Sequence, residues 1–176
     1  MAVLDRKNHA VLSERERKMV RHAQTGDLEQ LLTMYRELRV SGMPGITWSE
    51  AYPSDDDIRN DLTQHALYVL EWQGEVVASL ATEMDEVKDL VPCDPQAVSC
   101  EISRVAVRRS LQGRGLCGML MSETLDLLRE EGYQVIRLLV SGQNLPAYRA
   151  YLRAGFQILG EADKYDVHWT CCEKWL

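Results

Sequence analysis

The stretch RVAVRRSLQGRGLCG, residues 104–118, decides the fold of this chain. An apolar strand ends in it, a glycine-rich turn follows, and a strong amphipathic helix expected over 115–131 begins at once. The free N–H groups at a helix N-terminus attract anions, and glycines let a ligand approach the backbone closely. The stretch therefore predicts a strand–loop–helix unit that binds phosphate, with an ordinary tight turn and solvated arginines as the alternative.

The loop does not match the two commonest phosphate-binding motifs. No Gly-Lys-Ser/Thr sequence closes it, as a P-loop requires. Gly113, Gly115 and Gly118 fit the GxGxxG spacing, but several elements precede the loop and no βαβ repeat follows it. A diphosphate carrier other than NAD fits better, and Arg108, Arg109 and Arg114 would add local positive charge.

Hydrophobic periodicity on both sides of this stretch predicts alternating strands and helices. We expect one helix capped by Thr25, one capped by Ser54 and running to about Gln64, and one capped by Asn144 and ended by Gly155. The expected strands cover residues 19–23, 66–72, 75–83, 100–107, 135–140, 156–159 and 167–175. The strand–helix–strand order over 100–140 implies one parallel crossover. The sequence thus predicts a single-domain α/β fold: a mixed, mostly antiparallel sheet with helices on both faces.

Composition limits the classes of partner and the cellular location. The 176 residues favour one domain, residues 17–176, after a polar extension at residues 1–16. A net charge of −7 argues against nucleic acid as a partner. The chain lacks an apolar signal region and any apolar run of about 18 residues, so we expect a cytoplasmic protein without a membrane partner. Five cysteines without a CxxC pair predict reduced thiols and no metal site.

Two segments resemble one known family. QGRGLC, residues 112–117, resembles the Q/R-x-x-G-x-G/A loop of the GCN5-related N-acetyltransferase (GNAT) family, with Cys117 in place of Gly or Ala. NLPAYRAYLRAGF, residues 144–156, resembles the family's N-x-x-A-x-x-L-Y-x-x-x-G-F segment, with Ala150 in place of Leu. The resemblance implies a GNAT-like fold over 17–176 and an N-acetyltransferase. Such an enzyme moves an acetyl group from acetyl-CoA to a primary amine by direct attack in a ternary complex.

The resemblance also implies how coenzyme A is bound. Loop amides would hold its pyrophosphate, a strand would pair with its pantetheine arm, and a neighbouring strand would splay away. Main-chain N–H groups near Val105 and Val107 would stabilise the oxyanion. The implied cofactor-binding residues are Val105, Ala106, Val107, Gln112, Gly113, Arg114, Gly115, Leu116, Cys117, Gly118, Asn144 and Tyr148.

Two residues are candidates for acid–base catalysis. Tyr151 aligns with the tyrosine that family members place near the coenzyme sulfur, and Tyr148 is its neighbouring competitor. Glu101 resembles the strand glutamate that histone-type members use as base. It would act through water or with a pKa raised by burial, while a solvent-facing or substrate-orienting role stays open. Glu83 is a second candidate base.

The resemblance defines the acceptor site less closely. Trp48, Tyr52 and the run from Asp55 to Asp57, which includes Asp56, are candidates for the acceptor site, although such a run is often an exposed helix start. The acceptor would be a small-molecule or peptide amine, and the protein a monomer or homodimer. Cys100 and Cys117 are better explained as structural thiols than as acyl carriers.

Two alternatives to acetyl transfer remain at this point. EISRVAV, residues 101–107, resembles the strand of acyl-homoserine-lactone and long-chain N-acyl amino acid synthases, which share this fold. A non-catalytic module that binds acetyl-CoA is the other.

Overall fold

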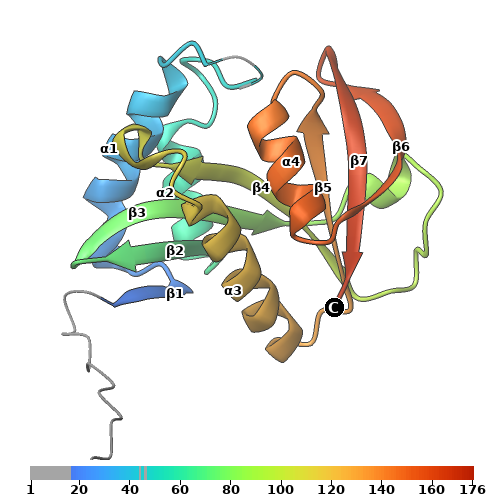
Figure 1. Ribbon diagram of the computed structural model, residues 1–176, viewed down its shortest axis with the longest axis horizontal. Coiled ribbons are helices and arrows are strands. Elements are labelled where there is room, and N and C mark those ends of the chain that lie inside the picture. The colour runs from blue at the N-terminus through green and yellow to red at the C-terminus, as the bar shows by residue number, and fades with distance from the viewer. Residues whose placement is uncertain (1–16, 44, 46) are drawn as a thin grey trace, which may run out of the picture.

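A central sheet carries the fold in the computed structural model, which describes residues 17–43, 45 and 47–176 (Figure 1). The expected extension over 1–16 lies outside the described residues. Within them the sheet has seven strands in the order β1-β2-β3-β4-β5-β7-β6. Their bounds are β1 Lys18–His22, β2 Leu67–Trp72, β3 Glu75–Glu83, β4 Ser99–Val107, β5 Val135–Ser141, β6 Gln157–Lys164 and β7 Val167–Trp175. Only β4 and β5 pair in parallel, which confirms the predicted mixed, mostly antiparallel sheet.

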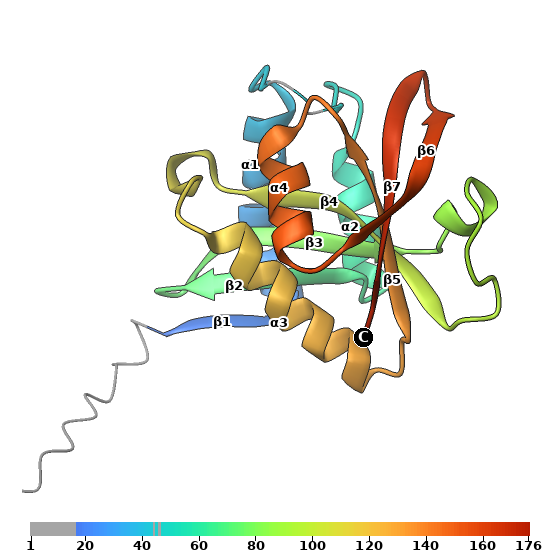
Figure 2. The same ribbon diagram turned by 45° about the vertical axis from the view of Figure 1, so that its right-hand side comes forward.

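Helices cover both faces of the sheet, as predicted (Figures 1 and 2). Helices α1 (Leu28–Arg39) and α2 (Asp55–Thr63) pack on one face, and α3 (Leu116–Glu130) and α4 (Leu145–Arg153) on the other. Successive side chains of β2 point to opposite faces of the sheet. Leu67 and Val69 therefore join the α1–α2 core, and Tyr68 and Leu70 join the α3–α4 core. None of the described helices is long and apolar enough to cross a membrane.

Local capping chemistry sets most helix ends where the sequence predicts them. The Ser54 hydroxyl accepts from the Asp57 N–H at 3.1 Å, and the Asn144 side chain accepts from the Ala147 N–H at 3.3 Å. Gly132 adopts a φ of 98° just after α3 ends, which is the left-handed conformation that closes many helices.

The structure corrects two boundaries. Thr25 does not cap the first helix: it lies in a 3-10 turn, Thr25–Asp27, which Gln24 precedes as cap, and Asp27 is the N-cap residue of α1. Strand β6 extends to Lys164, well beyond the expected end at residue 159. It forms a hairpin with β7 through Tyr165 and Asp166, which both have positive φ. Without a glycine there, the tight turn gave no sequence signal.

Strands β4 and β5 separate soon after they meet. Their parallel pairing comprises Ser99 with Val135, Cys100 with Ile136 and Glu101 with Arg137. Beyond Glu101, β4 continues to Val107 and β5 to Ser141 without pairing to each other. A β-bulge lies in this part of β4: Arg104 has a φ of 49°, and its carbonyl accepts from the Tyr35 hydroxyl at 2.7 Å.

Candidate functional site

A cavity of about 720 Å³ lies where β4 and β5 separate. Its walls come from β4, β5, the start of α4, the β6–β7 hairpin and the loop after α1. The volume is typical of a small-molecule site. The predicted site residues that line this cavity are Trp48, Tyr52, Glu83, Glu101, Val105, Asn144 and Tyr151.

Glu101 has the properties of a general base that works near neutral pH. Its side chain is buried at the cavity wall and accepts one hydrogen bond, from the Glu86 N–H at 3.2 Å. Burial, with a smaller contribution from the nearby Glu83, raises the pKa of its carboxyl to about 7 against the lowering effect of that amide. A base is most effective when its pKa lies near the working pH.

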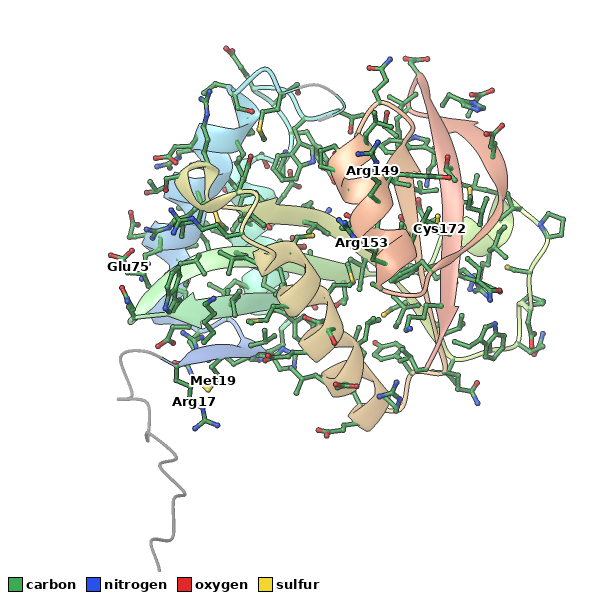
Figure 3. All side chains as sticks on the ribbon, viewed as in Figure 1. Arg17, Met19, Glu75, Arg149, Arg153 and Cys172 are labelled. Carbon is green, nitrogen blue, oxygen red and sulfur yellow. The ribbon has the colours of Figure 1, made fainter. Side chains whose placement is uncertain are left out.

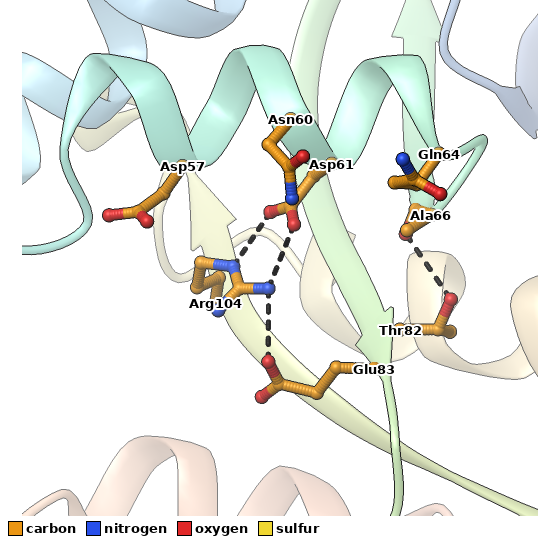
Figure 4. Close-up of a pocket in the computed structure, with 8 residues that line it drawn as sticks. All are labelled: Asp57, Asn60, Asp61, Gln64, Ala66, Thr82, Glu83 and Arg104. Carbon is orange, nitrogen blue, oxygen red and sulfur yellow. Dashed lines mark hydrogen bonds and ion pairs between the residues drawn. The ribbon is translucent and has the colours of Figure 1, made fainter.

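Glu83, the second candidate base, is held in an ion pair instead. It lies opposite Glu101 on the neighbouring strand and 3.2 Å from the Arg104 guanidinium. Arg104 also donates to Asp61 through Nε at 2.8 Å and Nη2 at 3.1 Å (Figure 4). A second cavity of about 340 Å³ adjoins these groups, and both cavities share Glu83 and Arg104. Of the two glutamates, Glu101 has the more suitable surroundings for a base.

The structure separates the two candidate tyrosines. Tyr151 is buried and lines the cavity, with its ring centre 6.1 Å from that of Phe156. Burial raises the pKa of its phenol, so the hydroxyl keeps its proton. Tyr148 packs against the α3–α4 core and does not line the cavity. Position therefore favours Tyr151 as the proton donor.

The loop before α3 presents a row of free main-chain amides. Gly113 and Gly115 both have a φ of 76°, and the first helical hydrogen bond runs from the Met119 N–H to the Gly115 carbonyl. Within the described residues, the N–H groups from Gly113 to Gly118 donate to no acceptor. Helix α3 begins at Leu116, with Gly115 as its N-cap, so Cys117 lies in the first turn. Such a row at a helix N-terminus suits a phosphate group.

The other predicted cofactor-binding residues lie at or beside this loop and along β4. Leu116 is buried under the loop, and the Gln112 side chain donates to the Val107 carbonyl at 3.1 Å. Arg114 is exposed, whereas Ala106 turns toward the α1–α2 core. The loop and the second half of β4 thus form one continuous stretch of backbone that leads to the cavity.

The arginines beside the loop differ in availability. Arg108 donates to Glu75 at 2.7 Å and to Gln30 at 3.0 Å, so its charge is already compensated. Glu75 lies at the start of β3 (Figure 3). Arg109 and Arg114 are exposed and form no ion pair with any described residue. These two arginines therefore add uncompensated positive charge near the loop.

Only some of the residues predicted for the acceptor site line the large cavity. Trp48 and Tyr52 line the large cavity. Asp55 pairs with Arg36 and Arg39, Asp56 pairs with Arg59, and neither lines either of the two cavities. Asp57 accepts from the Ser54 N–H at 2.7 Å in the capping box of α2, and of the two cavities it borders the smaller. The acidic run is mainly a helix start.

Several residues at the site were missed from the sequence. Asp61, Lys164, Tyr165 and Trp169 all line one of the two cavities. Asp61 lies in a polar helix and the other three on a hairpin whose turn was not predicted, so no local pattern marks them. Arg104, which lines both cavities, was also missed as a site residue. For this residue the sequence did offer a signal, because the E-x-S-R spacing places it three residues after Glu101.

A buried ion pair holds the segment that follows β3. Arg137 and Asp85 are almost fully buried, and Nη1 donates to Oδ2 at 2.5 Å. Arg137 also donates to Glu173 and to the Asp94 carbonyl, and Ser99 donates to Asp85. Because Glu86 follows Asp85, this network fixes the amide that contacts Glu101.

The cysteines have the surroundings of structural thiols. Burial raises the pKa of Cys100 to about 12 and that of Cys172 to about 11, and it also raises the pKa of Cys117. A thiol with a raised pKa is a poor nucleophile at neutral pH. No group of three or more His, Cys, Asp or Glu side chains in the described part of the chain is arranged to hold a metal ion.

Comparison with solved structures supports the fold. The chain matches an acetyltransferase of the GNAT family from Streptococcus agalactiae with a TM-score of 0.74 at 18% identity, over 90% of this chain and 95% of that one. It matches a phosphinothricin acetyltransferase from Sinorhizobium meliloti, solved with acetyl-CoA, with a TM-score of 0.70 at 17% identity, over 90% and 88%. At sequence identities below 20%, these matches show that the proteins share a fold and no more.

Comparison with curated sequences and families gives the family. The mycothiol acetyltransferase of Brachybacterium faecium is 38% identical over 60 residues, which make up 34% of this chain and 18% of that protein. That of Beutenbergia cavernae is 34% identical over 73 residues, 42% of this chain and 25% of that protein. The matches thus span a quarter or less of the length of these relatives. The model of the acetyltransferase (GNAT) family matches residues 29–156, well over half of the chain. The chain belongs to the acetyltransferase (GNAT) family.

Proposed function

We propose that the protein transfers an acetyl group from acetyl-CoA to a primary amine in a ternary complex. The observation that carries this proposal is the cavity between β4 and β5, where buried Glu101 and Tyr151 line one space. Membership of an acetyltransferase family supports it, and so does the fold shared with a protein solved with acetyl-CoA.

The coenzyme would lie along backbone that has no partner in the protein. Its pyrophosphate would bind the free amides from Gly113 to Gly118, beside Arg114. Its pantetheine arm would run along the part of β4 that β5 leaves unpaired, with Asn144 at the opposite wall. This path brings the thioester into the cavity near Tyr151.

The reaction then needs three proton transfers at the reacting groups. Glu101, directly or through water, takes a proton from the ammonium group of the acceptor, and the neutral nitrogen attacks the thioester carbon. A C–N bond forms, and N–H groups of β4 near Val105 stabilise the oxyanion. The attached nitrogen releases its second proton to water. The C–S bond breaks, and Tyr151, which regains its proton from water, protonates the leaving thiolate. A phenol is less acidic than a thiol, whose pKa is about 8.5, so this last step relies on the position of Tyr151.

A thiol-release assay with acetyl-CoA and a broad panel of amines tests the proposed function. We expect release that depends on an amine, that falls strongly in Tyr151→Phe and Glu101→Gln, and that is unchanged in Tyr133→Phe, a matched control at a half-buried tyrosine outside the cavity. Binding of acetyl-CoA without release with any amine would indicate a non-catalytic module. Faster turnover with long-chain acyl donors would instead favour the N-acyl amino acid synthase alternative.

A further inference from the structure

Both cations at the large cavity are already paired with carboxylates. Arg104 binds Asp61 and Glu83, and its remaining nitrogen, Nη1, donates to the Tyr52 hydroxyl at 2.9 Å. Lys164 pairs with Glu86, and its Nζ lies 4.8 Å from the centre of the Tyr165 ring. An anionic group on an acceptor would have to displace a carboxylate before it could pair with either cation.

Carboxylates are in excess around the reacting position. Glu83, Glu86 and Glu101 line the cavity against Arg104 and Lys164. Glu101 forms no ion pair with any described residue. A second anion placed beside Glu101 would meet like charge in a poorly solvated space, whereas an ammonium group would be attracted.

Large apolar side chains surround the mouth of the cavity. Met84 is 79% exposed, Tyr165 74% and Tyr52 42%, and the half-buried Trp48 and Trp169 also line the cavity. Exposed apolar side chains that gather around one opening commonly mark a binding surface. Aromatic rings offer flat faces that bury an apolar or aromatic body.

We propose that the acceptor is a primary amine on an aromatic or other apolar body, without a carboxylate or phosphate of its own. This substrate class rests on the proposed acetyl transfer. The amine reaches Glu101, and the apolar body lies against the rings at the mouth. An amino acid of the same size is disfavoured by its carboxylate, because both cations among the described residues that line the cavity, Arg104 and Lys164, are already paired.

Matched pairs of amines test this substrate class. We expect kcat/KM for tryptamine to exceed that for tryptophan by at least about tenfold, because one uncompensated charge repulsion is worth that much or more. Tyramine and tyrosine should differ in the same direction. Tryptophanamide, which replaces the carboxylate by a neutral group of similar size, should behave like tryptamine. Equal or better turnover of the amino acids, or a preference for spermidine over every aromatic amine, overturns the inference.

A substitution that removes one cavity carboxylate tests whether the paired cation causes the discrimination against amino acids. Glu86→Gln removes the carboxylate partner of Lys164 and leaves the Glu86 N–H in place for Glu101. We expect the discrimination against tryptophan to fall several-fold in this variant. Glu161→Gln is the control, because it removes an exposed carboxylate of the same hairpin that pairs with His168 away from the cavity. Equal discrimination in all three proteins contradicts the role of the paired cation.

Calorimetric titration separates a failure of this inference from a failure of the proposed function. Tryptamine and tryptophan are titrated into the protein with coenzyme A present, so turnover is not needed. Absence of thiol release with every amine contradicts acetyl transfer. The order of the two affinities still decides the acceptor class: tighter binding of tryptamine supports it, and equal or tighter binding of tryptophan refutes it.

Discussion

Replacing Glu101 by Gln is expected to stabilise the fold above neutral pH. Glu101 is 6% exposed, and burial raises the pKa of its carboxyl from the ordinary value of 4.5 to about 7. The folded protein therefore binds this proton more tightly than the unfolded chain does. Ionisation of Glu101 lowers stability progressively as the pH rises from about 4.5 to about 7. Glutamine mimics the protonated acid and cannot ionise.

The size of the effect follows from the change in pKa. At about 1.4 kcal/mol per pKa unit, a rise from 4.5 to about 7 corresponds to about 3 kcal/mol. We expect Glu101→Gln to match the wild-type free energy of unfolding near pH 4.5 and to exceed it by about 3 kcal/mol at pH 8.5. For a domain of this size that gain raises Tm by roughly 6–12 °C.

Urea denaturation of both proteins across this pH range measures the difference. Glu37→Gln, which changes an exposed carboxylate on α1, is the control and should show a small difference that does not depend on pH. A difference for Glu101→Gln that stays constant with pH, or a loss of stability at pH 8.5, would refute the reasoning. Either result would mean that the fold compensates the charge of Glu101.

The same variant links the pKa to catalysis. In the wild-type protein, kcat/KM should rise with pH up to about 7 and then level off, as Glu101 loses its proton. Glu101→Gln should lose this rise along with most of the activity. A stabilised but inactive variant would show that the buried carboxylate is retained at the expense of stability.

Three further substitutions test other parts of the structure. Tyr151→Phe should lower kcat by roughly a hundredfold with unchanged affinity for acetyl-CoA, measured by thiol release and calorimetry; an unchanged kcat would exclude Tyr151 as the acid. Gly115→Ala forces a side chain into a φ of 76° and should weaken acetyl-CoA binding by about five- to thirtyfold, from a strain of roughly 1–2 kcal/mol; equal affinity would remove the loop from the site. Arg137→Met leaves Asp85 buried without its cation and should lower the free energy of unfolding by about 3–5 kcal/mol. Pairing it with Asp85→Leu should recover part of that loss, and a simple sum of the two effects in urea denaturation would contradict the coupling.

The parts of the fold that depend on neighbouring residues were predictable from the sequence. Ser54 and Asn144 act on N–H groups three residues away, and Gly132 ends a helix by its own conformation. The parallel crossover followed from the order of elements around the loop. Each of these features is visible within one short segment.

The parts that depend on distant pairs were not predictable. Arg104 and Asp61 are 43 positions apart, and Arg137 and Asp85 are 52 apart. Arg137 lies inside an apolar strand, where nothing in the sequence indicates its partner. Asp55 looked like a candidate for cation binding, yet it pairs with Arg36 and Arg39 of α1. The sequence locates charged residues but does not show which charges are already compensated.

The short pairing between β4 and β5 has a consequence for amide hydrogen exchange. Only three residue pairs join the two strands, so backbone amides of β4 beyond Glu101 that point toward β5 have no strand to protect them. These amides should exchange with deuterium faster than those on the β3 side of the same strand. A molecule that lies extended in this gap would bridge the two halves of the sheet and slow that exchange, so the amides of β4 would report occupancy without any turnover.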